Sequence, residues 1–508
     1  MNASFFKKVL ISFTIFILPA LLNPSAQAEG PTDVSKFSQS LNNLLPQLLS
    51  ENLVPGAAVA LIQNGEVVFK KGYGYANLEK RQPVTPQTGF NIGSISKTVA
   101  AWGVMRLVEQ GRLALDTPVE TCLTRWHLPD SEFDKNGVTV RRLLSHTAGL
   151  SLHGYPGWGP KDKLPTIEES LSGATNGSGD VRLVMEPGSK WQYSGGGYTL
   201  AQLLVEEVTG QKFADYMREN ILRPLGMPHS DYRLTPDILA GTSVAYDDWG
   251  DPTPNPRFTA EAAAGLHTTI EDLATFAAAA LTGPNQEPPG RNILKPETIA
   301  IMLTPAPASP NYGLGYSIDS LPNGKTGRGH GGANRGWQAY LQIIPESGEG
   351  IVIVTNGSNG WSVHRQIFCA WAKWVTGSLP AQAGEPEGGC RKPIGLVLLQ
   401  TIEDHGIETA VKQYRELKSE HRDKYDFNEN QLNTLGYQLL RHKKISEAIE
   451  IFKLNVTAYP DAFNPYDSLG EAYMVNGDKD SAIKNYQKSL ELNPDNTNAL
   501  EMLKKLEN

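Results

Sequence analysis

The sequence predicts an α/β domain with an antiparallel sheet, followed by an all-α domain. Three observations support this division. Apolar strand patterns occur near both ends of the first 376 residues, and helical patterns lie between them, from about residue 118 to residue 281. A segment rich in glycine and proline follows. Beyond it strand patterns cease, and helical patterns repeat every 34 residues.

The first 28 residues have the pattern of a secretory signal peptide. Lys7 and Lys8 precede an apolar run, residues 9–22, and Ala26-Gln-Ala28 forms a cleavage site. The run is too short to cross a bilayer comfortably, so we expect cleavage after Ala28 and no membrane span afterwards. The protein is therefore expected to be exported, to a bacterial periplasm or the extracellular space.

The composition is acidic. The formal net charge is −8, and removal of the signal peptide with its two lysines makes it −10. This charge argues against nucleic acid and anionic membranes as partners. Neither a His-Glu-x-x-His motif nor a paired-cysteine spacing occurs, so we expect no zinc centre and no other cofactor.

Two hairpins are expected to supply strands to one antiparallel sheet. The first covers residues 57–69 and turns at Gly65, and the second covers residues 337–355 and turns at Gly348. Glycine supplies the backbone freedom that such turns need. The sheet is therefore expected to join both ends of the domain, with helices on its flanks.

A Ser-x-x-Lys pair, Ser94 and Lys97, begins a predicted helix that ends near Gly111. The spacing of three puts the lysine amine on the same helix face as the hydroxyl, one turn away. A serine hydroxyl is a weak nucleophile until a base activates it, and a helix N-terminus favours developing negative charge. The pair is thus a candidate nucleophile with its base.

Two further segments offer partners for this pair. Tyr193 lies in Trp191-Gln-Tyr-Ser-Gly-Gly-Gly197, where a glycine-rich turn could hold a phenol at the edge of a cleft. His330 lies in Gly329-His-Gly-Gly-Ala-Asn-Arg-Gly-Trp337, just before the second hairpin. Its glycines would let a substrate backbone lie close to the strand.

In this order, the three motifs resemble those of the serine β-lactamase and penicillin-binding-protein family. The resemblance is to the branch with class C β-lactamases, D-alanyl-D-alanine carboxypeptidases, D-aminopeptidases and family VIII esterases. It covers about residues 37–375 and includes four further segments, at residues 143–150, 224–227, 264–273 and 312–316. It implies a β-lactamase-like fold, with a helical insert between the two parts of the sheet.

The resemblance implies roles for the motif residues. It makes Ser94 the acylated nucleophile and gives the proton transfers to Lys97 and Tyr193. The backbone N–H groups of Ser94 and Ala333 would form the oxyanion hole. His330 stands where many relatives carry the lysine of a Lys-Thr-Gly strand. The expected substrate-binding residues are Gly331, Gly332 and Arg335.

Two departures from the family pattern affect the expected substrate. Gly195 stands where the second motif carries an asparagine that would orient a substrate carbonyl. His330 is largely neutral near pH 7 and binds a carboxylate less firmly than lysine does, although Arg335 could supply a cation. These departures favour ester or broad peptide hydrolysis over efficient β-lactam turnover.

A literal Lys325-Thr-Gly327 motif precedes His330. We favour His330 as the third motif, because Pro322-Asn-Gly-Lys325 has turn chemistry and the strand pattern begins after His330. If Lys325 were the cation instead, the oxyanion donor would shift to Arg328.

Other chemistries have weaker support. No Gly-x-Ser-x-Gly nucleophile elbow occurs. His146 and His267 are alternative bases, but the Ser-His-Thr-Ala-Gly segment predicts a structural hydrogen bond for His146 in a helix-ending turn. Cysteine is no better a nucleophile, since Cys369 lies in an apolar helical pattern and is expected to be a buried thiol. Three cysteines, Cys122, Cys369 and Cys390, cannot all pair within one chain.

The second domain matches the tetratricopeptide repeat. We assign residues 32–376 to the first domain, 377–392 to a linker and 393–508 to the second domain. Positions 34 apart correspond, Leu435-Gly436 with Leu469-Gly470 and Phe452 with Tyr486. Helices before and after these two repeats are expected to complete the stack, which would bind a peptide or protein partner or pack passively on the first domain.

Two functions follow from these features. The first is an exported serine hydrolase that attacks a peptide, ester or lactam carbonyl through an acyl-enzyme. The second is a penicillin-binding receptor without turnover, with the helical repeats as a scaffold. The presence of Ser94, Lys97 and Tyr193 together favours the hydrolase, because a retired site has no chemical reason to keep all three.

Overall fold

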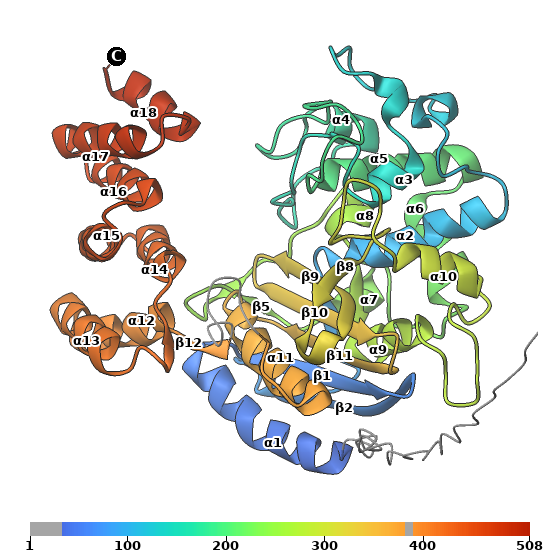
Figure 1. The fold of residues 1–508 in the computed structure, drawn as a ribbon, viewed down its shortest axis with the longest axis horizontal. Helices are drawn as coiled ribbons and strands as arrows, with labels where there is room; N and C mark the ends of the chain where they lie inside the picture. The colour runs from blue at the N-terminus through green and yellow to red at the C-terminus, as the bar shows by residue number, and fades with distance from the viewer. Residues whose placement is uncertain (1–32, 381–389, 508) are drawn as a thin grey trace, which may run out of the picture. The chain divides into compact units, whose positions relative to one another are not determined.

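The computed structural model describes residues 33–380 and 390–507, so the predicted signal peptide lies outside the described residues. A seven-stranded antiparallel sheet forms the centre of the first domain (Figure 1). Its order is β3-β2-β1-β11-β10-β9-β8. The strands are β1 Gly56–Gln63, β2 Glu66–Asn77, β3 Gln82–Pro83, β8 Ser317–Ser320, β9 Thr326–Asn334, β10 Trp337–Ile344 and β11 Glu349–Thr355.

Both predicted hairpins form, and they meet in the middle of the sheet. β1 pairs with β2 and also with β11, where Ala57 lies opposite Thr355. β10 pairs with β11 across the turn that contains Gly348. The two ends of the domain are therefore held together by backbone hydrogen bonds, as the sequence predicts.

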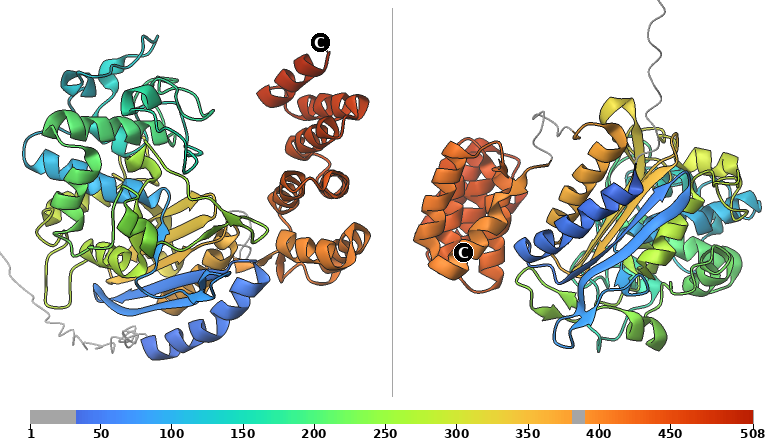
Figure 2. Two further views of the ribbon diagram at one scale, coloured as in Figure 1. Left: turned by 180° about the vertical axis from the view of Figure 1, so that it is seen from behind. Right: turned by 90° about the horizontal axis from the view of Figure 1, so that it is seen from below.

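Alternate residues of β1 enter cores on opposite faces of the sheet, as strand geometry requires. Val59 and Leu61 pack in the core under α1 (Val34–Glu51) and α11 (Gly360–Thr376), whereas Ala58, Ala60 and Ile62 face the larger core. The two helices lie side by side, with the rings of Phe37 and Trp374 stacked 4.6 Å apart (Figure 2). Because both faces are covered, β1 is apolar along its whole length.

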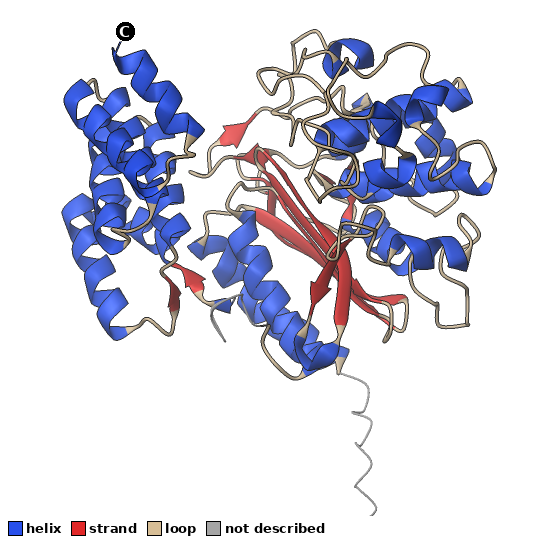
Figure 3. Ribbon diagram, turned by 45° about the horizontal axis from the view of Figure 1, so that its top comes forward, coloured by secondary structure: helices blue, strands red, loops and turns tan. Residues whose placement is uncertain are grey.

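The other face of the sheet carries the predicted helical insert (Figure 3). This side of the sheet also has two short antiparallel pairs that the sequence did not predict, because two or three residues are too few to show an alternating pattern. The helices of this region are α2 Ile95–Glu109, α3 Val140–Leu144, α4 Ile167–Leu171, α5 Gly195–Thr209, α6 Phe213–Met217, α7 Pro236–Gly241, α8 Glu261–Ala264, α9 Ile270–Ala279 and α10 Pro296–Met302. The short pairs are β4 Gly89–Asn91 with β7 His267–Thr269, and β5 Ala245–Tyr246 with β6 Pro252–Thr253.

One predicted strand boundary is wrong. The strand that contains His330 begins at Thr326, not after His330. Glycines at alternate positions leave no apolar alternation to detect. The strand forms because β8 and β10 supply hydrogen-bonding partners on its two sides.

The second domain consists of helices with the predicted 34-residue repeat, and a short parallel pair that the sequence did not predict, β12 Lys392–Pro393 with β13 Tyr425–Asp426. In the first repeat the ring of Phe452 packs directly on Gly436. A Cβ atom on Gly436 would lie 2.4 Å from the nearest ring atoms, which is too close for any residue but glycine. In the second, the Tyr486 ring takes the corresponding position against Gly470. The helices are α12 Ile394–His405, α13 Ile407–Glu420, α14 Glu429–Arg441, α15 Ile445–Ala458, α16 Phe463–Val475, α17 Lys479–Leu492 and α18 Thr497–Glu507. None of the helices described has the length and apolar character needed to cross a membrane.

The expectation of a buried Cys369 thiol is wrong. Cys369 of α11 forms a disulfide with Cys390, and their Cα atoms lie 5.8 Å apart. The helical pattern around Cys369 correctly predicted burial, but the partner is 21 residues away across the linker. Cys122 is the free cysteine among the described residues.

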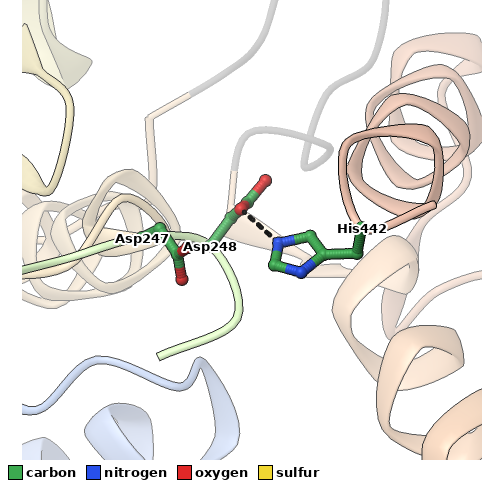
Figure 4. Close-up of side chains that lie close together, drawn as sticks. All are labelled: Asp247, Asp248 and His442. Atoms are coloured by element: carbon green, nitrogen blue, oxygen red, sulfur yellow. Dashed lines mark ion pairs between the residues drawn. The ribbon is translucent and has the colours of Figure 1, made fainter. Parts of the chain in front are cut away.

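The loop between β5 and β6 contacts the second domain. Trp249 stacks on His442, with ring centroids 4.1 Å apart. The carboxylate of Asp248 forms ion pairs with His442, at 3.5 Å, and with Arg441 (Figure 4). Asp247 accepts two backbone N–H groups of its own turn. The carboxylates of Asp247 and Asp248 are thus both bonded to N–H groups of the chain itself.

Candidate active site

Ser94 and Lys97 lie at the start of α2, as their spacing predicts. Ser94 is the N-cap residue, and Lys97 lies one turn further on. The Nζ atom of Lys97 is 3.1 Å from Ser94 Oγ and 2.7 Å from the carbonyl oxygen of Ala263, in α8. The lysine side chain is 2% exposed and forms no ion pair with any described residue. A buried amine without a carboxylate partner is suited to exchange a proton with a hydroxyl.

Glycines bring the start of α2 against β9. A Cβ atom on Gly93, which has a φ of +50°, would lie 2.5 Å from the nitrogen of Ala333. A Cβ atom on Gly332 would lie 1.9 Å from the carbonyl oxygen of Ile92. Only glycine fits at both positions.

Two backbone N–H groups near the nucleophile are candidates for the oxyanion hole, because they belong to residues that this approach brings together. The first is that of Ser94, because the first N–H groups of a helix have no partner within it. The second is that of Ala333. On β9 the carbonyl of Gly329 accepts a hydrogen bond from Ser317 Oγ on the β8 side. Alternate residues of a strand point the same way, so the Ala333 N–H points to that side, beyond the end of β8.

Tyr193 is held directly before α5. The hydroxyl oxygen of the next residue, Ser194, accepts the N–H of Gly197 at 2.9 Å and caps the helix. The Tyr193 ring lies under Lys97, whose Nζ atom is 4.9 Å from the ring centroid. The phenol oxygen is buried and has no hydrogen-bond partner among the residues that the structure describes. It is therefore free to bond to a reacting group.

His330 faces the same cleft from β9, with its ring centroid 6.1 Å from that of Tyr193. Its Nδ1 atom bonds to the carbonyl oxygen of Gly331 and so carries the proton, because a carbonyl can only accept. Nε2 is left with a lone pair and is buried, and no described residue is its partner. Burial, with a further contribution from Lys97, lowers the pKa of His330 to about 4. The residue is neutral at pH 7 and offers an acceptor, not a cation.

His146 holds the segment that carries Tyr193. The backbone carbonyl of His146 accepts the N–H of Gln192 at 2.8 Å, and its Nδ1 atom accepts the N–H of Ser194 at 3.1 Å. Its ring packs on that of Tyr193, with centroids 4.2 Å apart. Burial holds the pKa of His146 well below its usual value, and Lys97 lowers it further. The sequence predicted a structural hydrogen bond here but not that Tyr193 lies between its two partners.

Gly195 takes the position of the missing asparagine because the chain leaves no room for a side chain. A Cβ atom there would lie 2.9 Å from the carbonyl oxygen of His153. The Gly195 N–H donates to that oxygen at 3.0 Å. The loop that contains His153 thus fills the space that an amide side chain would need.

Two predicted cations lie outside the cleft. Arg335 is exposed in the turn between β9 and β10, and Lys325 donates to the carbonyl of Val375 at 3.0 Å. His267, the other alternative base, is buried in β7 and does not line the cleft. The cleft measures about 660 Å³. Its predicted lining residues are Ser94, Lys97, Tyr193, His330, Gly331, Gly332 and Ala333, and those not predicted include Ala263, Ala264, Asn334, Gln338 and Trp361.

The sequence of the chain is similar to those of known proteins. The Beta-lactamase family model matches residues 41–367, and the tetratricopeptide repeat model matches residues 468–496. Protein flp of Staphylococcus aureus (strain N315) is 25% identical over 335 residues, which cover 63% of this chain and only 63% of flp. Penicillin-binding protein 4 of Amycolatopsis lactamdurans is 29% identical over 344 residues, 63% of this chain and 86% of that protein.

A solved structure also resembles the chain. The octameric penicillin-binding protein homologue from Pyrococcus abyssi is 28% identical, with a TM-score of 0.56. The match covers 73% of this chain and 81% of that one.

Proposed function

Because this chain belongs to the beta-lactamase family, we propose that it is a serine hydrolase that acts through an acyl-enzyme on Ser94. The observation that carries the proposal is the 3.1 Å contact between Ser94 Oγ and the Nζ atom of buried Lys97. Tyr193 and Ala333 line the same cleft. Together these residues supply a nucleophile, a proton carrier and two oxyanion donors.

The proposed reaction has two steps. In the first, the Ser94 hydroxyl gives its proton to the pair Lys97 and Tyr193 while Oγ bonds to the substrate carbonyl carbon. The N–H groups of Ser94 and Ala333 stabilise the negative oxygen, a contribution of about 2.7 to 4 kcal/mol per donor. The bond to the leaving group breaks, and the proton passes to the leaving atom. In the second, water replaces the leaving group, releases the acid and restores the hydroxyl.

The charges around the cleft support an ester or peptide substrate over a β-lactam. Penicillins and D-alanyl-D-alanine peptides present a carboxylate to the third motif. His330 is neutral there, and the exposed Arg335 lies outside the cleft. A carboxylate would therefore find no strong partner at that position.

We also propose that the protein is exported and that its helical repeats bind a protein or peptide. The pattern of residues 1–28 supports export. The tetratricopeptide match supports a binding role for the second domain, since stacked helical repeats form extended binding surfaces.

The test uses the full mature chain with p-nitrophenyl butyrate and, separately, a fluorescent penicillin. We expect ester turnover by the natural protein and by Ser189→Ala, an exposed control. Ser94→Ala should lose turnover to near the uncatalysed rate. With the ester, intact-mass analysis after acid quenching should find a butyryl group on Ser94.

Two outcomes would contradict the proposal. Full esterase activity in Ser94→Ala would exclude Ser94 as the nucleophile. Lasting penicillin label without turnover of any ester would favour the receptor function instead.

A further inference from the structure

A second hollow of about 560 Å³ adjoins the catalytic cleft. We call it the aromatic subsite, defined by Trp191, Tyr193, Tyr312, His330 and the loop of residues 309–311. It shares Trp191, Tyr193 and His330 with the cleft but includes neither Ser94 nor Lys97. A molecule bound at Ser94 can therefore extend past Tyr193 into this subsite.

The walls of the aromatic subsite are flat rings. The ring centroids of Trp191 and Tyr312 are 6.3 Å apart, and the Tyr312 ring meets His330 edge-on at 5.9 Å. Two buried polar atoms lie in these walls, the phenol oxygen of Tyr312 beside the Tyr198 hydroxyl and Nε2 of His330, which has no partner among the described residues. The space thus suits an apolar group that carries one or two hydrogen-bonding atoms.

None of the described residues that line the subsite is an acid, a lysine or an arginine. A carboxylate inside it would lose water without gaining a charge partner, which is costly. A cation would approach Lys97, whose amine lies over the Tyr193 ring at 4.9 Å. The subsite therefore disfavours both anionic and cationic groups and accepts an uncharged group.

The position of Tyr193 identifies which part of the substrate enters. In the proposed reaction Tyr193 and Lys97 return the Ser94 proton to the leaving atom, so that atom lies beside the phenol. The subsite begins at Tyr193 and leads away from Ser94. Its occupant must be the remainder of the leaving group.

We infer that the aromatic subsite receives the leaving group and selects an uncharged, apolar one, such as an aryl or alkyl alcohol. The inference rests on the proposed function. In the acylation step the Ser94 Oγ–carbon bond forms, the bond from the carbonyl carbon to the leaving oxygen breaks, and the leaving oxygen takes the proton. The released alcohol is neutral and departs from the aromatic walls.

Two acetate esters test this selectivity on the full chain, phenyl acetate and 3-acetoxybenzoate. Both form the same acetyl-enzyme, so a difference in kcat/KM reports on the leaving group alone. We expect kcat/KM to be at least tenfold higher for phenyl acetate. Equal or better use of 3-acetoxybenzoate would overturn the inference and leave the proposed function intact. If neither ester acylates Ser94, the inference and the proposed function are both wrong.

Two substitutions sharpen the result. His330→Lys places a cation in the wall, so we expect the preference for phenyl acetate to shrink at least tenfold or to reverse.

Tyr312→Ala removes a wall and should lower kcat/KM for phenyl acetate about tenfold. If that variant does not fold, Trp191→Ala, whose side chain is largely exposed, replaces it. Leu239→Ala on the exposed face of α7 is the control and should keep the natural ratio. An unchanged ratio in His330→Lys would overturn the inference.

Discussion

At the residue scale, two of the three histidines beside Tyr193, His146 and His330, have opposite tautomers. Nδ1 of His146 accepts a backbone N–H, so the proton of its neutral ring is on Nε2. Nδ1 of His330 donates to a carbonyl, so its Nε2 is an acceptor. These two rings near Tyr193 are thus uncharged, and Lys97 is the amine that lines the cleft among the described residues. Proton transfer there depends on how accurately the phenol is positioned.

His146 should therefore affect turnover more than substrate binding. His146→Ala removes the acceptor for the Ser194 N–H, and we expect kcat to fall about tenfold or more with KM nearly unchanged. His146→Asn should recover part of the loss, because the asparagine oxygen can accept the same N–H and asparagine tolerates the φ of +59°. Steady-state kinetics and the melting temperature of each variant provide the measurement. If His146→Ala had a lower melting temperature but the same kcat as the natural protein, His146 would have a structural role only.

At the element scale, the site depends on the approach of the α2 N-terminus to β9. The proposed oxyanion donors come from these two elements, and glycine at positions 93 and 332 permits their contact. A helix start supplies one free N–H, and the end of β8 leaves another free on β9. Neither donor would face the cleft if the two elements were a side chain's width further apart.

Adjacent glycines of β9 offer a matched test of this contact. Gly332→Ala puts a methyl group 1.9 Å from a backbone oxygen of Ile92, so β9 must shift. We expect kcat to fall by about 10²- to 10³-fold, as for the loss of one oxyanion donor. In Gly331→Ala the methyl group meets only the exposed Trp361 ring, at 3.2 Å, which can move. That control should stay within a few-fold of the natural kcat, and equal losses in both variants would count against the contact.

The disulfide between α11 and Cys390, near the end of the linker, is a second feature at this scale. Thiol titration of the denatured, unreduced chain should find one free thiol, that of Cys122, and three after reduction. Cys369→Ala combined with Cys390→Ala should lower the stability by about 3 kcal/mol, since the bridge closes a loop across 21 positions. Three thiols before reduction would contradict the pairing.

At the scale of the whole molecule, stability in the first domain is coupled to pH through buried histidines. Burial lowers the pKa of His267 and of His330 to about 4 and that of His364 to about 3. Their ordinary value in an unfolded chain is 6.5. Between these values the unfolded chain binds more protons than the folded one, so stability falls as the pH falls. Each group whose pKa drops to about 4 contributes about 3 kcal/mol above pH 6.5, which is lost towards pH 4.

Urea unfolding at pH 7.5 and at pH 5 measures this effect. All nine tryptophans precede residue 377, so their fluorescence reports mainly on the first domain, and Trp249 also senses its contact with His442. We expect a clearly lower midpoint at pH 5. His364→Gln should reduce the difference between the two midpoints, because it removes one of the groups that must be protonated. An identical difference in the variant and the natural chain would contradict the role of His364.

Sequence patterns predicted this fold well where neighbouring residues decide the structure. The hairpins, the helix that starts at Ser94 and the 34-residue repeat depend on periodicity and turn residues within short windows. The start of β9 could not be found in this way, because its glycine-rich segment is a strand only through its neighbours. Likewise, nothing near His146 in sequence indicates that it holds Tyr193.

By itself, then, the sequence determined the family, the order of elements and the residue types available for acyl transfer. The tertiary structure alone decided which of them meet. It excluded Arg335 and Lys325 from the cleft, joined Cys369 to Cys390 and filled the space beside Gly195 with the loop of His153. The physical reason is that each of these outcomes depends on contacts between segments that packing brings together, and no local pattern encodes such contacts.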